Sequence, residues 1–229
     1  VQIRELYVDY SAENYDLRLG KQYIIWGVLE GVRIVDEINP MDFRELILPD
    51  LLDYRIPLWS AKLDYYTDYG DIQFLLIPDL KFHKPAPSGS EWELLQAVPN
   101  TRSPQSWKLE NVEYGLKLDT SFWDTEFSFS YFYTWDDYPV IFRTVKIAAS
   151  SSEAPEFFPA YTRISIYGMT AVRQFDDYIL KMELAYVEDK FFGLSNTADD
   201  NNDDYVDTNG EIQKDHIRWG LGTDTVLWG

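Results

Sequence analysis

Residues 178–186, YILKMELAY, place an apolar or aromatic side chain at every second position. The alternating set is Tyr178, Leu180, Met182, Leu184 and Tyr186, and the polar side chains between them include Lys181 and Glu183. Successive side chains of an extended strand point to opposite faces, so the pattern predicts a β-strand with one apolar and one polar face. A preceding strand that contains Ile164 and Ile166, joined by the turn RQFDD, would complete a hairpin.

Similar strands recur along the whole chain, and the connections between them alternate in length. Short connections are predicted near residues 11, 69, 121 and 175, and long ones at residues 26–57, 81–110, 136–160 and 193–212. Bacterial outer-membrane barrels combine short turns at one end with long loops at the other. The alternation therefore predicts an all-β protein, an antiparallel transmembrane β-barrel of about nine strands.

Composition is consistent with this fold class and excludes several others. Aromatic residues make up 17% of the 229 residues, and the net charge of −19 leaves no basic face for nucleic acid. Cysteine is absent, which removes disulfides and thiolate chemistry. No apolar run reaches the roughly 18 residues that a transmembrane helix needs. We expect contact with outer-membrane lipid and with a small solute, and no nucleic-acid partner.

Residues 26–57, WGVLEGVRIVDEINPMDFRELILPDLLDYRIP, interrupt the alternation. Asn39 and Pro40 resemble a helix N-cap and first helical position, and Phe43, Leu46, Ile47, Leu51 and Leu52 follow at roughly helical spacing. These residues predict two short helical turns, bent at Pro49 and packed against the inner wall of the barrel. The domain prediction is one barrel, or a fragment of one, over residues 1–229, with residues 27–57 as an insert in its lumen.

The charged residues of the insert are predicted to narrow the lumen into a constriction that filters solutes. They are Arg33, Asp36, Glu37, Asp42, Arg44, Glu45, Asp50, Asp53 and Arg55. Strand parity predicts further lumen-facing side chains at Asp16, Arg18, Lys62, Asp64, Gln73, Glu113, Lys117, Glu126, Arg163, Lys181, Glu183, His216 and Arg218. The alternating apolar residues would face lipid.

Three motifs near the beginning of the chain carry a family resemblance. They are LRLGKQ with WG (residues 17–27), INPMDFRE (residues 38–45) and LPDLLDYRIPLW (residues 48–59). In this order they resemble an uncharacterised porin-like family of Gram-negative outer-membrane β-barrel proteins, most closely over residues 3–80. The resemblance implies an outer-membrane location, passage or binding of a solute, and a longer chain than this one. It supplies no catalytic residues.

Two other classes of protein stay open: a soluble β-sandwich that binds a ligand, and an outer-membrane enzyme. Only His83 and His216 offer imidazoles, far apart in sequence, and no nucleophile or phosphate-binding motif accompanies them. We therefore expect a channel rather than an enzyme, with no cofactor and no metal centre. The acidic tract at residues 199–211 is interpreted as a solvated loop, with weak divalent-cation binding as the alternative.

Overall fold

A computed structural model describes residues 3–45, 54–93, 98, 100–143, 156–193 and 211–225. Its strands are β1 (Leu6–Ser11), β2 (Tyr15–Gln22), β3 (Leu58–Thr67), β4 (Gly70–Ile77), β5 (Glu113–Phe122), β6 (Thr125–Trp135), β7 (Val140–Arg143), β8 (Phe157–Ala160), β9 (Arg163–Phe175), β10 (Tyr178–Gly193) and β11 (Glu211–Thr225). A single 3-10 turn, Leu109–Asn111, is the one helical element among the described residues. No helix in these ranges is long and apolar enough to cross a membrane.

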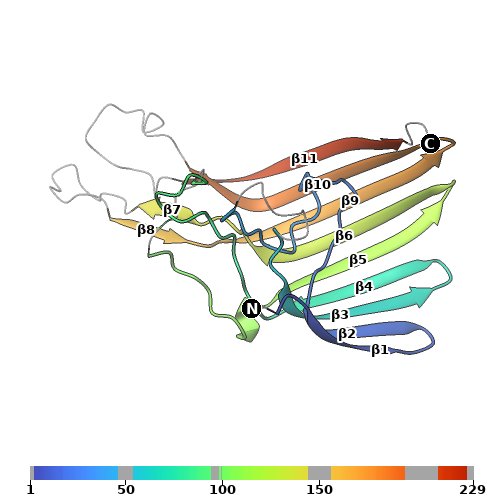
Figure 1. Cartoon of the computed structure of the whole chain (residues 1–229), viewed down its shortest axis with the longest axis horizontal. Coiled ribbons are helices and arrows are strands. Elements are labelled where there is room, and N and C mark those ends of the chain that lie inside the picture. Colours follow the sequence, from blue (N-terminus) through green and yellow to red (C-terminus); the bar gives the residue numbers. More distant parts are fainter. Residues whose placement is uncertain are drawn as a thin grey trace.

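Nine of the strands form one antiparallel sheet in the order β1-β2-β3-β4-β5-β6-β9-β10-β11 (Figure 1). Strands β7 and β8 pair separately within the connection from β6 to β9. Every pair of neighbours in the large sheet is consecutive in the chain apart from this detour. The predicted all-β, antiparallel architecture is confirmed. The four short turns lie at one end of the sheet and the long connections meet the strands at the other.

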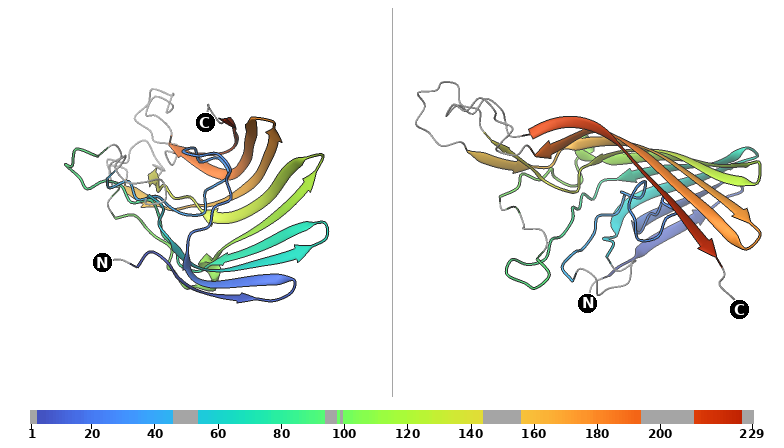
Figure 2. Two further views of the ribbon diagram at one scale, coloured as in Figure 1. Left: turned by 45° about the vertical axis from the view of Figure 1, so that its right-hand side comes forward. Right: turned by 90° about the horizontal axis from the view of Figure 1, so that it is seen from above.

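The sheet is open, so the closed barrel expected from the sequence is not observed. Among the described residues β1 pairs only with β2, and β11 pairs only with β10. With nine strands that alternate in direction, the first and the last run the same way. Direct pairing of these two edges would be parallel, unlike every other pair in the sheet. Figure 2 shows the strands following an arc, with the insert inside its concavity.

The outer, convex face of the sheet carries an apolar row that crosses all nine strands. Residues paired in register along this row are Tyr10, Leu17, Leu63, Phe74, Leu116, Tyr131, Tyr167, Tyr186 and Ile217. Several of them are largely exposed, such as Phe74 at 48% and Ile217 at 64%. A sheet face that contacts water usually carries the polar side chains of its strands, whereas this exposed face carries the apolar ones.

The inner, concave face is divided into two zones. The zone toward the long connections, which we call the upper zone, is apolar and packs against the insert through sheet residues Leu75, Ile77, Phe132, Ile164, Ile166 and Val187. The zone toward the short turns, which we call the lower zone, is polar and contains Lys62, Asp64, Gln73, Lys117 and Asp119. The sequence predicted a uniformly polar inner face, and this is wrong for the upper zone because the insert covers that zone and makes it a protein core.

Glycines on three strands let the insert lie close to the sheet. A Cβ atom at Gly115 would come within 2.5 Å of Trp26, and one at Gly220 within 2.5 Å of Ile34. At Gly168 the nearest insert atom, on Val35, would be only 2.7 Å away. Such contacts are far inside van der Waals distance, so each position requires glycine for this packing.

The described part of the insert does not contain the predicted helical turns. Its described parts, residues 27–45 and 54–57, have no helix, and the remaining predicted turn at residues 46–53 lies outside the described residues. Instead two segments of the insert, residues 40–42 and 54–56, pair with each other, and we call them its arms. Asp42 N donates to Tyr54 O at 2.6 Å, and Ile56 N donates to Pro40 O at 2.8 Å. The Asn39 side chain is fully buried and bonds to Ile24 N and Ile56 O. Because these bonds occupy its amide group, it does not cap a helix as the sequence predicted.

Candidate functional site

Glu183 on β10 fastens the insert to the inner face of the sheet. Its carboxylate is fully buried and accepts hydrogen bonds from Val28 N at 2.5 Å, Leu29 N at 2.7 Å and Val35 N at 3.1 Å. Both oxygens take part, and all three donors are backbone amides of the insert. A buried carboxylate is stable when donors surround it in this way, so Glu183 fixes the position of residues 28–35.

A second chain of contacts links the insert core to the polar lower zone. Trp26, 3% exposed, donates from Nε1 to Gln73 Oε1 at 2.6 Å, and Gln73 Nε2 donates to Asp64 Oδ1 at 2.5 Å. Asp64 in turn pairs with Lys62 at 2.8 Å. The indole N–H is thereby satisfied at the boundary between the two zones, where an aromatic ring with one polar end fits.

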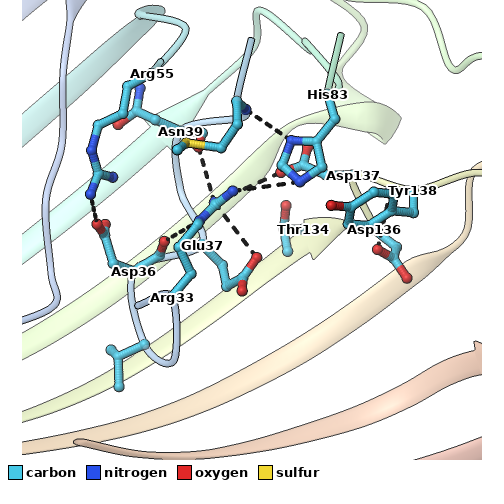
Figure 3. A network of polar contacts seen from close by, with 12 residues as sticks. Arg33, Asp36, Glu37, Asn39, Arg55, His83, Thr134, Asp136, Asp137 and Tyr138 are labelled. Carbon is cyan, nitrogen blue, oxygen red and sulfur yellow. Dashed lines mark hydrogen bonds and ion pairs between the residues drawn. The ribbon is translucent and has the colours of Figure 1, made fainter. Parts of the chain in front are cut away.

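Four charged residues of the insert, Arg33, Asp36, Glu37 and Arg55, lie together with Asn39 of the insert and with His83 and Asp137 from two long connections. We call this group the insert network (Figure 3). Arg33 lies at its centre. Its Nε donates to Asp36 O at 2.9 Å, and its Nη2 donates to Asn39 O at 3.0 Å and lies 3.6 Å from Glu37 Oε2. Asp137, from the connection after β6, lies 4.0 Å from the same nitrogen.

Asp36 and Arg55 form a largely buried ion pair within the insert. Asp36 also accepts from Trp26 N at 3.3 Å, so both of its oxygens have partners. Asn39 accepts from Ile24 N at 2.8 Å and donates to Ile56 O at 2.9 Å. These bonds tie the two ends of the insert together at its base.

His83 packs between two aromatic rings, with centroid distances of 5.2 Å to Phe43 and 4.6 Å to Tyr138. Its Nδ1 accepts from Met41 N at 2.8 Å, so the neutral ring carries its proton on Nε2. Nε2 lies 3.5 Å from Arg33 Nη1, where two N–H groups would face each other. Burial and the nearby Arg33 and Lys190 charges lower the pKa of His83 to about 3.

The buried, neutral His83 gives a testable pH dependence. Since its pKa is about 3 when folded and 6.5 normally, the unfolded chain binds this proton first. The contribution of His83 to stability is present above pH 6.5 and falls as the pH drops toward 3, by up to about 1.4 kcal/mol per pH unit. Burial raises the pKa of Asp137 well above its ordinary value, and its contribution has the opposite sign: it is present below the normal carboxyl pKa and lost as the pH rises.

We therefore expect the stability difference between the native protein and a His83→Gln variant to shrink between pH 6.5 and about 4, as measured by urea unfolding. His83 Nδ1 lies 3.6 Å from Asp137 Oδ2, so the contributions of the two residues are coupled. Repeating the comparison on an Asp137→Asn background removes the Asp137 titration from the difference. A difference that stays flat over this interval would contradict a buried neutral imidazole.

Two further ion pairs reach the last strands of the sheet, one from Glu37 of the insert network and one from Asp136, the residue before Asp137. Arg218 on β11 donates to Glu37 at 2.6 Å, and Lys190 on β10 donates to Asp136 at 2.5 Å. A small cavity of about 70 Å³ lies between these pairs. Because Glu37 contacts both Arg33 and Arg218, the insert is held by charge as well as by packing.

The polar lower zone of the inner face consists largely of ion pairs. Lys62 lies 2.8 Å from Asp64, Lys117 2.9 Å from Asp119, and Lys181 2.5 Å from Asp224. Arg18 and Asp9 form a further pair at 2.6 Å on the edge strands β1 and β2, and Asp16 accepts from Tyr66 at 2.6 Å. The lower zone thus presents both signs of charge to the concave side.

Of the residues predicted to form the constriction, the structure brings together Arg33, Asp36, Glu37 and Arg55. Asp42 and Arg44 lie elsewhere: they pair with each other at 2.6 Å, and the Arg44 side chain is 53% exposed. Glu45 is exposed, and Asp50 and Asp53 lie outside the described residues.

Most of the residues predicted to face the lumen lie on the inner face, but they differ in burial, and Arg163 lies on the other face. Glu113 is buried there and accepts from Thr134 at 2.6 Å, while Glu126 is exposed beside a short turn. His216 lies on the edge strand with its ring 5.4 Å from Phe192. Arg163 is on the outer face, 4.3 Å above the Trp135 ring. Its predicted orientation is wrong because Ile164 is turned inward, onto the insert.

Sequence reasoning missed four members of this arrangement: Trp26, Asn39, His83 and Asp137. Trp26 and Asn39 looked like a motif residue and a helix cap, and their buried hydrogen bonds depend on tertiary contacts. His83 and Asp137 come from two different long connections, so no local spacing links them. The proline-rich context of His83 gave no sign of its burial.

No group of three or more His, Cys, Asp or Glu in the described part of the chain has a metal-binding arrangement. Residues 199–210 of the acidic tract are outside that part.

The fold and the site define a class of protein: a curved antiparallel sheet with an apolar outer face and a polar insert fastened inside it. The chain belongs to the family described as protein of unknown function (DUF1302), whose model matches residues 1–228. The comparison with curated proteins gave no match, and neither did the comparison with solved structures.

Proposed function

We propose that this chain forms the wall of a porin-like channel in the outer membrane of a Gram-negative bacterium, with a lumen narrowed by residues 27–57. The observation that carries the proposal is the apolar row across all nine strands of the outer face. Lipid is the solvent that suits such a face, and the ion pairs of the lower inner zone suit a water-filled lumen.

The distribution of aromatic residues supports the same proposal. The outward side chains of β5 are Tyr114, Leu116, Leu118, Thr120 and Phe122, and those of the first nine residues of β10, 178–186, are Tyr178, Leu180, Met182, Leu184 and Tyr186. Both stretches therefore place aromatic rings at their ends and mostly aliphatic residues between them. Eight residues span about 27 Å along a strand, which after tilt is close to the apolar band of an outer-membrane barrel.

A closed barrel requires strands in addition to the nine described. Since β1 and β11 run in the same direction, antiparallel closure needs an odd number of further strands between them. Such strands would come from further chain or from another subunit. Closure would also protect the exposed edges, which otherwise invite aggregation.

The two other candidate functions have weaker support. A soluble β-sandwich needs a second sheet over an apolar face, but here the described connections pack on the opposite, concave face. For an enzyme, the pKa of about 3 makes His83 a poor general base, and the buried carboxyl of Glu113 is already held by hydrogen bonds from Thr134 Oγ1 and Trp135 N.

The proposal predicts that the insert limits conductance. Replacing residues 28–55 by a short glycine-serine linker is feasible because Ile24 N and Ile56 O both bond to the side chain of Asn39, so the two ends of the insert lie close together in the native fold. In planar lipid bilayers this variant of the full chain should show a larger single-channel conductance than the native protein. Shortening the connection at residues 87–93, whose hydrogen bonds are local and do not reach the insert, serves as a control.

Unchanged conductance after the deletion would contradict a role of the insert as the constriction. Absence of channels from both proteins, although both are folded in vesicles, would contradict the channel itself.

A further inference from the structure

A hollow of about 540 Å³ lies in the lower zone of the inner face, beside the short turn between β3 and β4. Part of its surface is a row of side chains paired in register across four strands: Asp71 on β4, Asp119 on β5, Ser128 on β6 and Thr170 on β9. Val28 of the insert also lines it. The volume of the hollow is typical of small-molecule sites.

Of the described residues that line the hollow, four are acidic and none is basic. The acidic residues are Asp68, Asp71, Asp119 and Glu126. Asp119 lies 2.9 Å from Lys117 and accepts a hydrogen bond from Ser128. The other three carboxylates form no ion pair or hydrogen bond within the described part of the chain, and all three residues are exposed to solvent.

The basic side chains at nearby positions of the sheet do not balance these charges, because each already has an acidic partner. Lys62 pairs with Asp64 at 2.8 Å, and Lys181 pairs with Asp224 at 2.5 Å. Asp71 and Asp119 are directly opposite each other in the register of β4 and β5, where two like charges repel. The hollow therefore has an excess of negative charge that favours a cation.

Thr170 gives an independent indication of a ligand. It is 2% exposed and lines the hollow, and its hydroxyl has no hydrogen-bond partner among the described residues. Buried hydroxyls are nearly always hydrogen-bonded, so this one calls for a partner within the hollow. Glu126 is a diagonal neighbour of Thr170 across β6 and β9, close enough for both side chains to reach one ligand group.

We infer that this hollow is a binding site for a small linear diamine. One ammonium group lies between Asp71 and Asp119. The other lies at Glu126, where the Thr170 hydroxyl accepts a hydrogen bond from it. The two positions are two strand spacings apart, about 10 Å at the backbone, and side chains converge on the concave side of the arc (Figure 2).

The other lining residues suit such a ligand. Val28 and Val172 offer apolar surface to the methylene groups between the two ammonium groups. A single metal ion does not suit the hollow, because in the described part of the chain no three acidic side chains have a metal-binding arrangement. The inference rests on the proposed channel, which places the concave face in water, and it names the class of solute that the channel would select.

The test uses diaminopentane with an amine at each end, pentylamine, pentanediol and magnesium chloride as probes of the full chain in detergent. Binding is measured by calorimetry against a protein-free micelle blank. The diamine should bind saturably, pentylamine should bind about tenfold more weakly, the factor of one charge-assisted hydrogen bond, and pentanediol should not bind. Asp71→Asn and Glu126→Gln should each weaken diamine binding by about tenfold, and both residues are exposed, so the fold should be retained.

Asp177→Asn is the matched control, because Asp177 is exposed in the short turn between β9 and β10 and does not line the hollow. It removes the same charge at the same end of the sheet and should change diamine binding by less than about twofold, since salt screens distant charges. Thr170→Val separates binding from folding. It should weaken diamine binding without lowering the free energy of unfolding, because the hydroxyl that it removes has no partner among the described residues.

Equal binding of the diamine and pentanediol would overturn the inference, as would tighter binding of Mg²⁺ than of the diamine. Equal effects of Asp71→Asn and Asp177→Asn would also overturn it, because they would indicate a general attraction to an acidic protein.

Calorimetry in detergent does not depend on ion flow, and conductance in potassium chloride does not depend on a diamine. A protein that binds the diamine but forms no channel would thus retain the site and lose the proposed function, and the reverse result would do the opposite.

Discussion

Replacing Glu183 with alanine is expected to lower the free energy of unfolding by about 4 kcal/mol. Glu183 accepts hydrogen bonds from Val28 N, Leu29 N and Val35 N, all within 3.1 Å. Each charge-assisted bond contributes about 1.5–3 kcal/mol, and three buried amides would be left without an acceptor. Equilibrium urea unfolding of the folded protein measures the loss.

Two variants on the same strand make this result interpretable. Glu183→Gln keeps one carbonyl oxygen but turns an N–H₂ group toward one of the amides, so its loss should be intermediate. Glu188→Ala removes the same carboxylate from a position that receives one hydrogen bond, at 3.3 Å, from Tyr167, and should cost less than about 1 kcal/mol. Similar losses for Glu183→Ala and Glu188→Ala would mean that the insert does not depend on this carboxylate.

The Glu183 variant should also release the insert. Trp26, Ile34 and Val35 pack on sheet glycines only while residues 28–35 are held against β10. Protease digestion should therefore cut within the insert of the alanine variant sooner than in the native protein. Under the proposed function the same variant should give a larger or less steady conductance, which links the fastening of the insert to the width of the lumen.

The sequence predicted the strands because alternation is a local signal. Residues 178–186 form the expected strand, and the four short turns lie close to the predicted positions. Parity failed at Arg163 because Ile164 and Ile166 are turned inward onto the insert, and this contact joins residues far apart in the chain. The pattern of β9 alone contains no sign of that contact.

The candidate site was predicted only in part for the same reason. The charges of Arg33, Asp36, Glu37 and Arg55 were visible in one segment, and they do form a cluster. The spacing from Phe43 onward suggested a helix, but in the described part of the insert residues 40–42 and 54–56 are held by hydrogen bonds to each other. The role of Glu183 is invisible in the sequence, since its three partners are backbone amides about 150 residues earlier.

Leu118→Arg is the substitution that best separates a lipid-facing outer surface from a water-facing one. Leu118 lies on β5 midway between Tyr114 and Phe122, is 39% exposed, and is paired with Ile72 and Phe129 on the neighbouring strands. If lipid covers this face, an arginine near the middle of the apolar band should cost about 2–4 kcal/mol. If water covers it, the same change to an exposed side chain should stay within about 0.5 kcal/mol.

The neighbouring residue provides the control for this last prediction. Lys117 points to the inner face and pairs with Asp119 at 2.9 Å, and Asp119 keeps a second partner in Ser128. Lys117→Leu should therefore cost less than about 1 kcal/mol, although it changes charge at the adjacent position. Both variants are unfolded with urea from phospholipid vesicles. A large loss for Leu118→Arg with a small one for Lys117→Leu supports a membrane-facing sheet, and equal losses would count against it.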